Sequence, residues 1–110
     1  MHHEITAARK IIEEIPEKDR GQVESIEIEV GELAEFTAEE LKQSIEDLTG
    51  WKVEVKKVIS EIQCSCGFIG QANILNRQGH ILIYNCPKCK SFAVRPLVGQ
   101  DIKLKRVVSY

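Results

Sequence analysis

Residues 64–89 read CSCGFIGQANILNRQGHILIYNCPKC and hold all four cysteines of the chain. These form two close pairs, Cys64 with Cys66 and Cys86 with Cys89, and 19 residues separate the inner members of the pairs. A short turn lets two thiolates reach one ion, and a tetrahedral Zn²⁺ takes four such ligands about 2.3 Å away. Because four thiolates leave no open position for chemistry, the spacing predicts a structural zinc site.

Other uses of the cysteines remain open from the residues alone. Two disulfides are disfavoured because a Cys64–Cys66 bridge would close a very small, strained ring, and because the charged first fifteen residues do not resemble a secretory signal. An iron–sulfur centre usually follows other cysteine spacings. The first pair is also irregular, because it is C-x-C where zinc knuckles usually have C-x-x-C, so we expect a narrower turn there.

The charge of the chain is unevenly distributed. Its 110 residues fit one ordinary domain, and its formal net charge is -2. Residues 1–62 contain 8 Lys/Arg and 16 Asp/Glu, whereas residues 63–100 contain four basic residues and no acidic one. The cysteine segment is therefore interpreted as an inserted subdomain. No apolar run approaches the roughly 20 residues needed to cross a bilayer, so no membrane contact is expected.

Apolar periodicity predicts the elements that precede the cysteines. Spacings of three and four predict a helix over 2–15, ended by Pro16. Residues 23–30 alternate between apolar and polar types, which predicts a strand with one wet face.

A capping box, Thr37 to Glu40, predicts the start of a second helix, whose apolar stripe runs to Leu48 and which Gly50 ends. Residues 52–62 are predicted to form one strand, with a bulge or twist where two consecutive lysines interrupt the alternation.

The same patterns predict the remaining elements. A hairpin is expected from residues 68–75, a turn at 76–79 and a strand at 81–84, with later strands over 94–98 and 102–108. The predicted class is α+β: a three-stranded sheet with two helices, plus an inserted zinc-ribbon subdomain. The expected division is 1–62 with 99–110 as one domain and 63–98 as the ribbon.

The first four residues, Met1-His2-His3-Glu4, form a second metal-binding motif. The Met1 amine, the amides that follow it and an imidazole can wrap one ion in fused chelate rings. Planar nitrogen coordination suits Ni²⁺ and Cu²⁺, and by intrinsic affinity copper binds more tightly. The histidines could instead be a tag remnant or polar residues at a helix start.

Together the two motifs make the chain resemble the HypA family of nickel-incorporation proteins. The resemblance rests on Met1 to Glu4, the run Ile28-Glu29-Val30-Gly31-Glu32-Leu33-Ala34, the helix from Thr37 to Leu48, the two late cysteine pairs and the closing strand. It covers essentially the whole length, and the order of these features is highly specific.

The resemblance implies a nickel metallochaperone of the cytoplasm, with Ni(II) as cargo and Zn(II) as a structural ion. Carried over, His2 with the Met1 amine is the prime nickel ligand set, and Glu4 is a residue that orients the site or contacts a partner. The implied partners are the nickel-binding GTPase HypB, the [NiFe]-hydrogenase large subunit and, in some members, urease maturation proteins. The expected state is a monomer or a homodimer.

The sequence departs from the family pattern in three places. His3 is inserted before the acid, so His3 could replace His2 or join it as a ligand. The C-x-C pair alters the first knuckle. Thr37 stands where some members carry an acid implicated in nickel binding, and its N-cap role accounts for it.

Other candidate residues receive structural interpretations. His80 is expected in an exposed loop, because four cysteines already satisfy zinc. Glu32 and Glu35 are interpreted as surface charge. The small core of the ribbon is expected to contain Phe68, Tyr84 and Phe92. No nucleophile–base pair or phosphate loop is found, so no enzymatic activity is expected. The alternative function is a zinc-ribbon nucleic-acid or transcription-complex module, which the acidic helices and sheet oppose.

Overall fold

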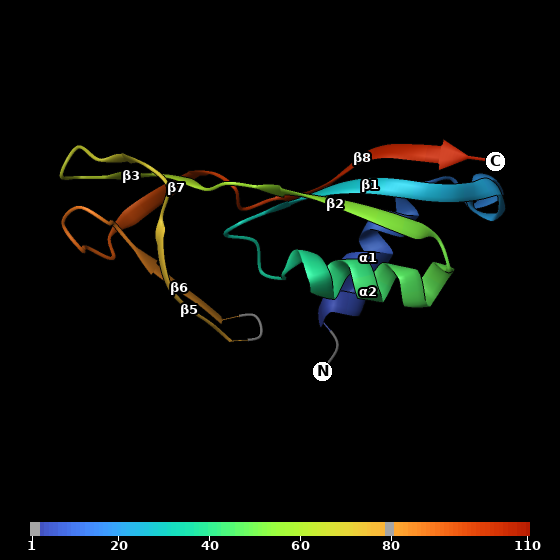
Figure 1. Ribbon diagram of the computed structural model, residues 1–110, viewed down its shortest axis with the longest axis horizontal. Coiled ribbons are helices and arrows are strands. Elements are labelled where there is room, and N and C mark those ends of the chain that lie inside the picture. The colour runs from blue at the N-terminus through green and yellow to red at the C-terminus, as the bar shows by residue number, and fades with distance from the viewer. Residues whose placement is uncertain (1–2, 79–80) are drawn as a thin grey trace.

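The computed structural model describes residues 3–78 and 81–110, and at positions 3, 4 and 78 it describes the backbone alone. The molecule is elongated, with extents of 50 × 27 × 17 Å (Figure 1). Two three-stranded sheets follow one another along the long axis, both helices lie beside only one of them, and a separate two-stranded hairpin accompanies the other. In the part of the chain that is described, no helix has the length and apolar character that a membrane span requires.

The predicted order of helix, strand, helix, strand, insert and strand is confirmed. We call the first sheet and its helices the α/β part. It consists of α1 His3–Glu13, the 3-10 helix η1 Glu17–Gln22, β1 Val23–Gly31, α2 Ala38–Thr49, β2 Lys52–Val58 and β8 Ile102–Ser109. The α+β class is confirmed as well.

The sheet of the α/β part has the order β2-β1-β8. Strand β1 runs parallel to β2, with Ile28 opposite Val55, and α2 supplies the crossover that a parallel pair needs. On its other side β1 is antiparallel to β8, where Ile28 faces Leu104. The last strand therefore returns to the first sheet after the insert, as predicted.

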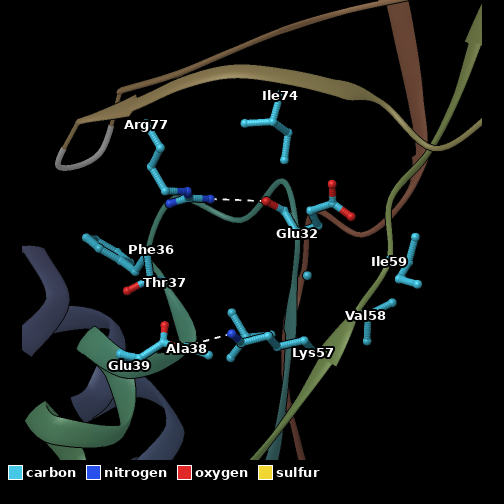
Figure 2. Close-up of a pocket in the computed structure, with 12 residues that line it drawn as sticks. Glu32, Phe36, Thr37, Ala38, Glu39, Lys57, Val58, Ile59, Ile74 and Arg77 are labelled. Carbon is cyan, nitrogen blue, oxygen red and sulfur yellow. Dashed lines mark hydrogen bonds and ion pairs between the residues drawn. The ribbon is translucent and has the colours of Figure 1, made fainter. Parts of the chain in front are cut away.

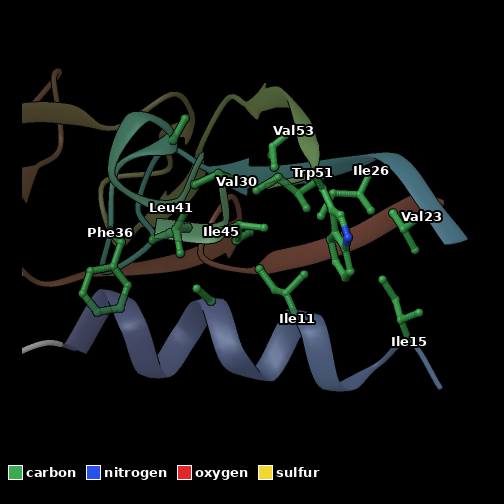
Figure 3. Packing of buried hydrophobic residues seen from close by; sticks show 14 residues of the cluster. Ile11, Ile15, Val23, Ile26, Val30, Phe36, Leu41, Ile45, Trp51 and Val53 are labelled. Atoms are coloured by element: carbon green, nitrogen blue, oxygen red, sulfur yellow. The ribbon is translucent and has the colours of Figure 1, made fainter. Parts of the chain in front are cut away.

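The main hydrophobic core lies between this sheet and the two helices (Figure 3). Its members include Ile26, Ile28 and Val30 of β1, Ile11 of α1, Leu41 and Ile45 of α2, and Trp51. The alternation predicted for β1 is thus confirmed, because Ile26, Ile28 and Val30 are all buried in this core. Each fully buried side chain of this kind contributes about 1.5–3 kcal/mol.

Helix α2 begins and ends where the sequence predicts. The Thr37 hydroxyl accepts a hydrogen bond from the Glu40 backbone N–H at 3.1 Å, and Gly50 takes the left-handed conformation with φ 76°. Leu48 is 43% exposed, so the apolar stripe is buried only as far as Ile45. Helix α1 is shorter than the predicted 2–15 and ends at Glu13.

The insert, which we call the ribbon, contains five short strands. They are β3 Glu61–Cys64, β4 Ile69–Gly70, β5 Asn73–Gln78, β6 Ile81–Asn85 and β7 Val94–Val98. The order β4-β3-β7 makes one sheet, and β5 and β6 pair separately as an antiparallel hairpin. A small cluster holds the ribbon together and consists of Leu33, Ile62 and Ala72, with Phe68, Leu82, Tyr84 and Val94 packed against it.

Two predicted details of the ribbon are wrong. Phe92 is 63% exposed and takes no part in the small cluster, unlike the other two predicted aromatic residues. Asn76 and Arg77 lie inside β5 rather than in a turn, because the ladder shifts by one residue at Leu75 and then continues. The remainder of the predicted 76–79 turn, with His80, falls at positions 79–80, outside the described residues.

The single strand predicted over 52–62 is also wrong. It divides into β2 and β3, which belong to different sheets, and the break lies at Ile59 and Ser60 rather than at the two lysines. The reason is tertiary. Gly99 passes so close that a Cβ there would lie 2.8 Å from the Cα of Ser60, and the Ser60 N–H is bound by the Glu32 carboxylate.

Candidate metal centre and the junction beside it

The four cysteine thiols converge at one end of the ribbon. All four Sγ atoms lie within 4.8 Å of one another, with Cys64–Cys89 at 3.5 Å and Cys66–Cys86 at 3.8 Å. Ligands 2.3 Å from a tetrahedral ion stand about 3.8 Å apart, so the separations fit zinc. Cys64 and Cys86 are buried and the other two are exposed, which places the centre at the surface of the ribbon.

Two similar turns bring each pair of thiols together. In the first, the Gly67 N–H donates to the Cys64 carbonyl at 2.9 Å, and Gly67 has φ 96°. In the second, the Lys90 N–H donates to the Cys86 carbonyl at 2.9 Å, and Lys90 has φ 65°. In each case the residue after the second cysteine adopts a left-handed conformation. The shorter C-x-C pair therefore still presents two thiols to a common centre.

The protonation of the thiols differs across the centre. Burial raises the pKa of Cys86, but the backbone N–H groups of Cys89 and Lys88, with the neighbouring thiols, outweigh it and lower that pKa to about 7. At Cys89 the Ser91 N–H lowers the pKa, whereas the Cys64 thiol, burial and the other thiols raise it to about 11. A metal ion would displace the protons that remain, because only thiolates bind it.

The geometry of the four thiols argues against the two disulfide bonds considered from the sequence. All four cysteines are free, and the Cys64–Cys89 and Cys66–Cys86 Sγ separations of 3.5 and 3.8 Å exceed the roughly 2.05 Å of a disulfide bond. The donor set of four soft thiolates in a closed shell fits zinc and leaves no position for a substrate.

The predicted nickel ligands lie at the N-terminal end of the chain, before and at the start of α1. Met1 and His2 lie outside the described residues. His3 is the first residue of α1 and Glu4 the second, but their side chains are not described. The nickel site therefore stays a prediction from the sequence.

Sequence reasoning missed the role of Glu32, which was interpreted as surface charge. Its carboxylate accepts hydrogen bonds from the Ser60 backbone N–H at 3.1 Å and from Gln71 Nε2 at 3.0 Å. Glu35, in contrast, is exposed as expected. Glu32, which directly follows β1, is thus hydrogen-bonded both to the connection between β2 and β3 and to the residue that follows β4.

A groove opens at this junction, between the β5–β6 hairpin and the start of α2 (Figure 2). Its volume is about 360 Å³, and its lining includes Val30, Phe36, Val58, Ile59, Ile74 and Arg77. Lys57 and Glu39 form an ion pair of 2.9 Å at its rim, where both side chains are largely exposed. The Arg77 guanidinium points at backbone carbonyls of the loop before α2.

Comparison with known proteins assigns the chain to a family. The model for HypA, described as hydrogenase/urease nickel incorporation, metallochaperone, matches residues 1–109. The chain belongs to the HypA family. The HypA resemblance read from the two metal motifs is confirmed, and the chain is a member of a metallochaperone family.

Individual HypA relatives agree with this assignment. A hydrogenase maturation factor HypA from Parabacteroides distasonis is 32% identical over 96% of each chain. A factor of the same name from Methanocaldococcus jannaschii is 30% identical and covers 94% of this chain and 93% of its own. The solution structure of the Ni metallochaperone HypA from Helicobacter pylori shares the fold, with a TM-score of 0.57 at 16% identity over 96% of each chain.

Proposed function

We propose that this HypA family member binds one Ni²⁺ at its N-terminus and delivers it during maturation of [NiFe]-hydrogenase. The Met1 amine, His2, His3 and the amides between them would supply nitrogen ligands, which suit Ni²⁺. Glu4 would orient this site. The observation that carries the proposal is the family match, which runs from residue 1 to residue 109 and so includes the predicted ligands.

The four cysteines would hold a structural Zn²⁺. Bound there, the ion would join the end of β3 to the segment after β6 and so stabilise a ribbon whose own cluster has only three buried residues, Leu33, Ile62 and Ala72. The closed thiolate shell supports a role without catalysis, and we propose no enzymatic activity for the chain.

The proposed division places nickel binding in residues 1–62 and 99–110 and zinc binding in residues 63–98. Two separate hydrophobic clusters support it, although the ribbon sheet itself begins at Glu61. The proposed partners are the GTPase HypB and the hydrogenase large subunit, acting in the cytoplasm as in the family. The family description also names urease, which supports urease maturation proteins as further recipients.

Nickel transfer tests the delivery step. The zinc-containing chain is loaded with one equivalent of Ni²⁺, mixed with a nickel-free hydrogenase large-subunit precursor, and separated from it before nickel is counted in each fraction. We expect nickel to move to the precursor from the unmodified chain and not from a His2→Ala/His3→Ala variant. Equal transfer from both proteins would contradict the proposal.

A further inference from the structure

The loop between β1 and α2, residues 32–36, belongs to both cores of the molecule. Leu33 lies in the small cluster of the ribbon, although it is not part of the inserted segment. Ala34 and Phe36, one and three residues later, lie in the main core of the α/β part. The position of this loop therefore fixes how the ribbon meets the α/β part.

The base of the β5–β6 hairpin is attached to this junction by side chains. Gln71 Nε2 donates to the Glu32 carboxylate at 3.0 and 3.2 Å, and the Ala72 N–H donates to the Ser60 hydroxyl at 3.1 Å. Ser60 is buried and its own N–H is bound by Glu32. Residues 71 and 72 directly precede β5, so these bonds hold the hairpin where it leaves the ribbon sheet.

Further along the hairpin, one side chain makes a second attachment. The Arg77 guanidinium donates to three backbone carbonyls of the loop, those of Glu32 at 3.1 Å, Ala34 at 2.6 Å and Glu35 at 3.4 Å (Figure 2 shows the first). No residue of the segment 62–100 is acidic, so this cation has no carboxylate partner within that segment. Planar guanidinium offers five donors in a fixed fork, which a lysine cannot reproduce.

The rest of the hairpin gives little independent stability. Strands β5 and β6 pair only with each other, and an isolated two-stranded sheet is marginally stable in water. Leu82 and Tyr84 of β6 pack against the small cluster, but Leu75, Ile81 and Ile83 are exposed, so one apolar face of the hairpin is in contact with the ribbon and the other is not. Ile74 and Arg77 of β5 line the groove together with Phe36 and Val58.

We propose that Arg77 is a releasable latch that holds the β5–β6 hairpin against the loop before α2, and that its release lets the hairpin pivot about its base and open the groove. The base stays attached through Glu32 and Ser60, while the far end has Arg77 as its main polar attachment among the described residues. This inference concerns the fold of the chain and does not depend on the proposed nickel site.

Hydrogen exchange on the zinc-loaded full chain, read by mass spectrometry, tests the latch. In an Arg77→Met variant we expect the amides of residues 74–78 and 81–84 to exchange roughly tenfold to a hundredfold faster, because a two-stranded hairpin released from the loop is only marginally stable. Amides of β1, β2 and β8 should keep their rates. Arg95→Met is the matched control, because it removes one positive charge from the ribbon and only a 3.2 Å contact to Gln63.

Two outcomes would overturn the proposal. The first is an unchanged exchange rate at residues 74–78 and 81–84 of Arg77→Met. The second is an equal acceleration in β1, which would mean general destabilisation rather than a local release. Zinc content is measured in every sample, and if Arg77→Met loses zinc, the test moves to Arg77→Lys, for which intermediate acceleration is expected. Loss of zinc from both variants would also overturn the latch, because it would make Arg77 necessary for the metal centre.

Discussion

Thr37 shows how one side chain determines the start of an element next to the junction. Its hydroxyl accepts the Glu40 N–H, and it stands between Phe36, which lies in the main core, and Ala38, the first residue of α2. In the family resemblance this position can carry an acid with a role in nickel binding. Here the N-cap hydrogen bond accounts for the presence of threonine.

Replacing Thr37 with alanine should destabilise the chain by about 1 kcal/mol, because the N-terminal turn of α2 loses its cap. The measurement is urea unfolding followed by the fluorescence of Trp51, which is buried in the same core. Thr37→Ser is the matched control, since it keeps the accepting oxygen and should cost much less. Equal losses in the two variants would show that the hydroxyl does not act as a cap.

Gly31 must be glycine because the backbone of Gly99 lies very close to it. A Cβ at this position would lie 2.1 Å from the carbonyl oxygen of Gly99, so the β1 end and the β7–β8 connection would have to separate. Gly31→Ala should therefore cost at least about 1–3 kcal/mol, the usual range for overpacking. At Gly21 nothing lies within 4 Å of the added Cβ, so Gly21→Ala should be close to neutral. Chemical denaturation compares the two, and similar stabilities would contradict the close approach.

At the scale of elements, local patterns predict what local forces decide. The alternation in β1 and the cap and glycine of α2 are read directly from neighbouring residues, and the structure confirms them. The break between β2 and β3 could not be found in this way. The break depends on Gly99, some forty residues downstream, and on the Glu32 carboxylate. The irregularity was therefore predicted at the two consecutive lysines instead of at Ile59 and Ser60.

The ribbon is the part of the molecule that we expect to depend most on a bound metal ion. Among the residues whose side chains are described, its cluster has three buried members and the core of the α/β part has fourteen. Removing zinc with a chelator, or replacing Cys86 with serine, should therefore loosen β3 to β7 and leave β2-β1-β8 and both helices folded. Amide resonances in a heteronuclear NMR spectrum would report this residue by residue. Collapse of the whole spectrum would contradict the independence of the two cores.

On the scale of the whole molecule, the two metal motifs were more informative together than apart. The spacing of the four cysteines correctly predicted that their thiols lie together, because one tetrahedral metal site requires all four side chains to meet. The Arg77 contacts had no comparable signal, because backbone carbonyls carry no sequence code. The only hint was the absence of acidic residues between positions 62 and 100, which leaves the basic residues of that segment without a carboxylate partner inside it.

A nickel titration of the zinc-loaded chain tests the central claim most directly. Metal analysis and the d–d absorption band are followed while Ni²⁺ is added to the unmodified chain and to the His2→Ala/His3→Ala variant. The predicted result is one Ni²⁺ per chain with a planar band, lost in the variant while the zinc content stays the same. Undiminished nickel binding by the variant would contradict the assignment of the nickel site to the N-terminus.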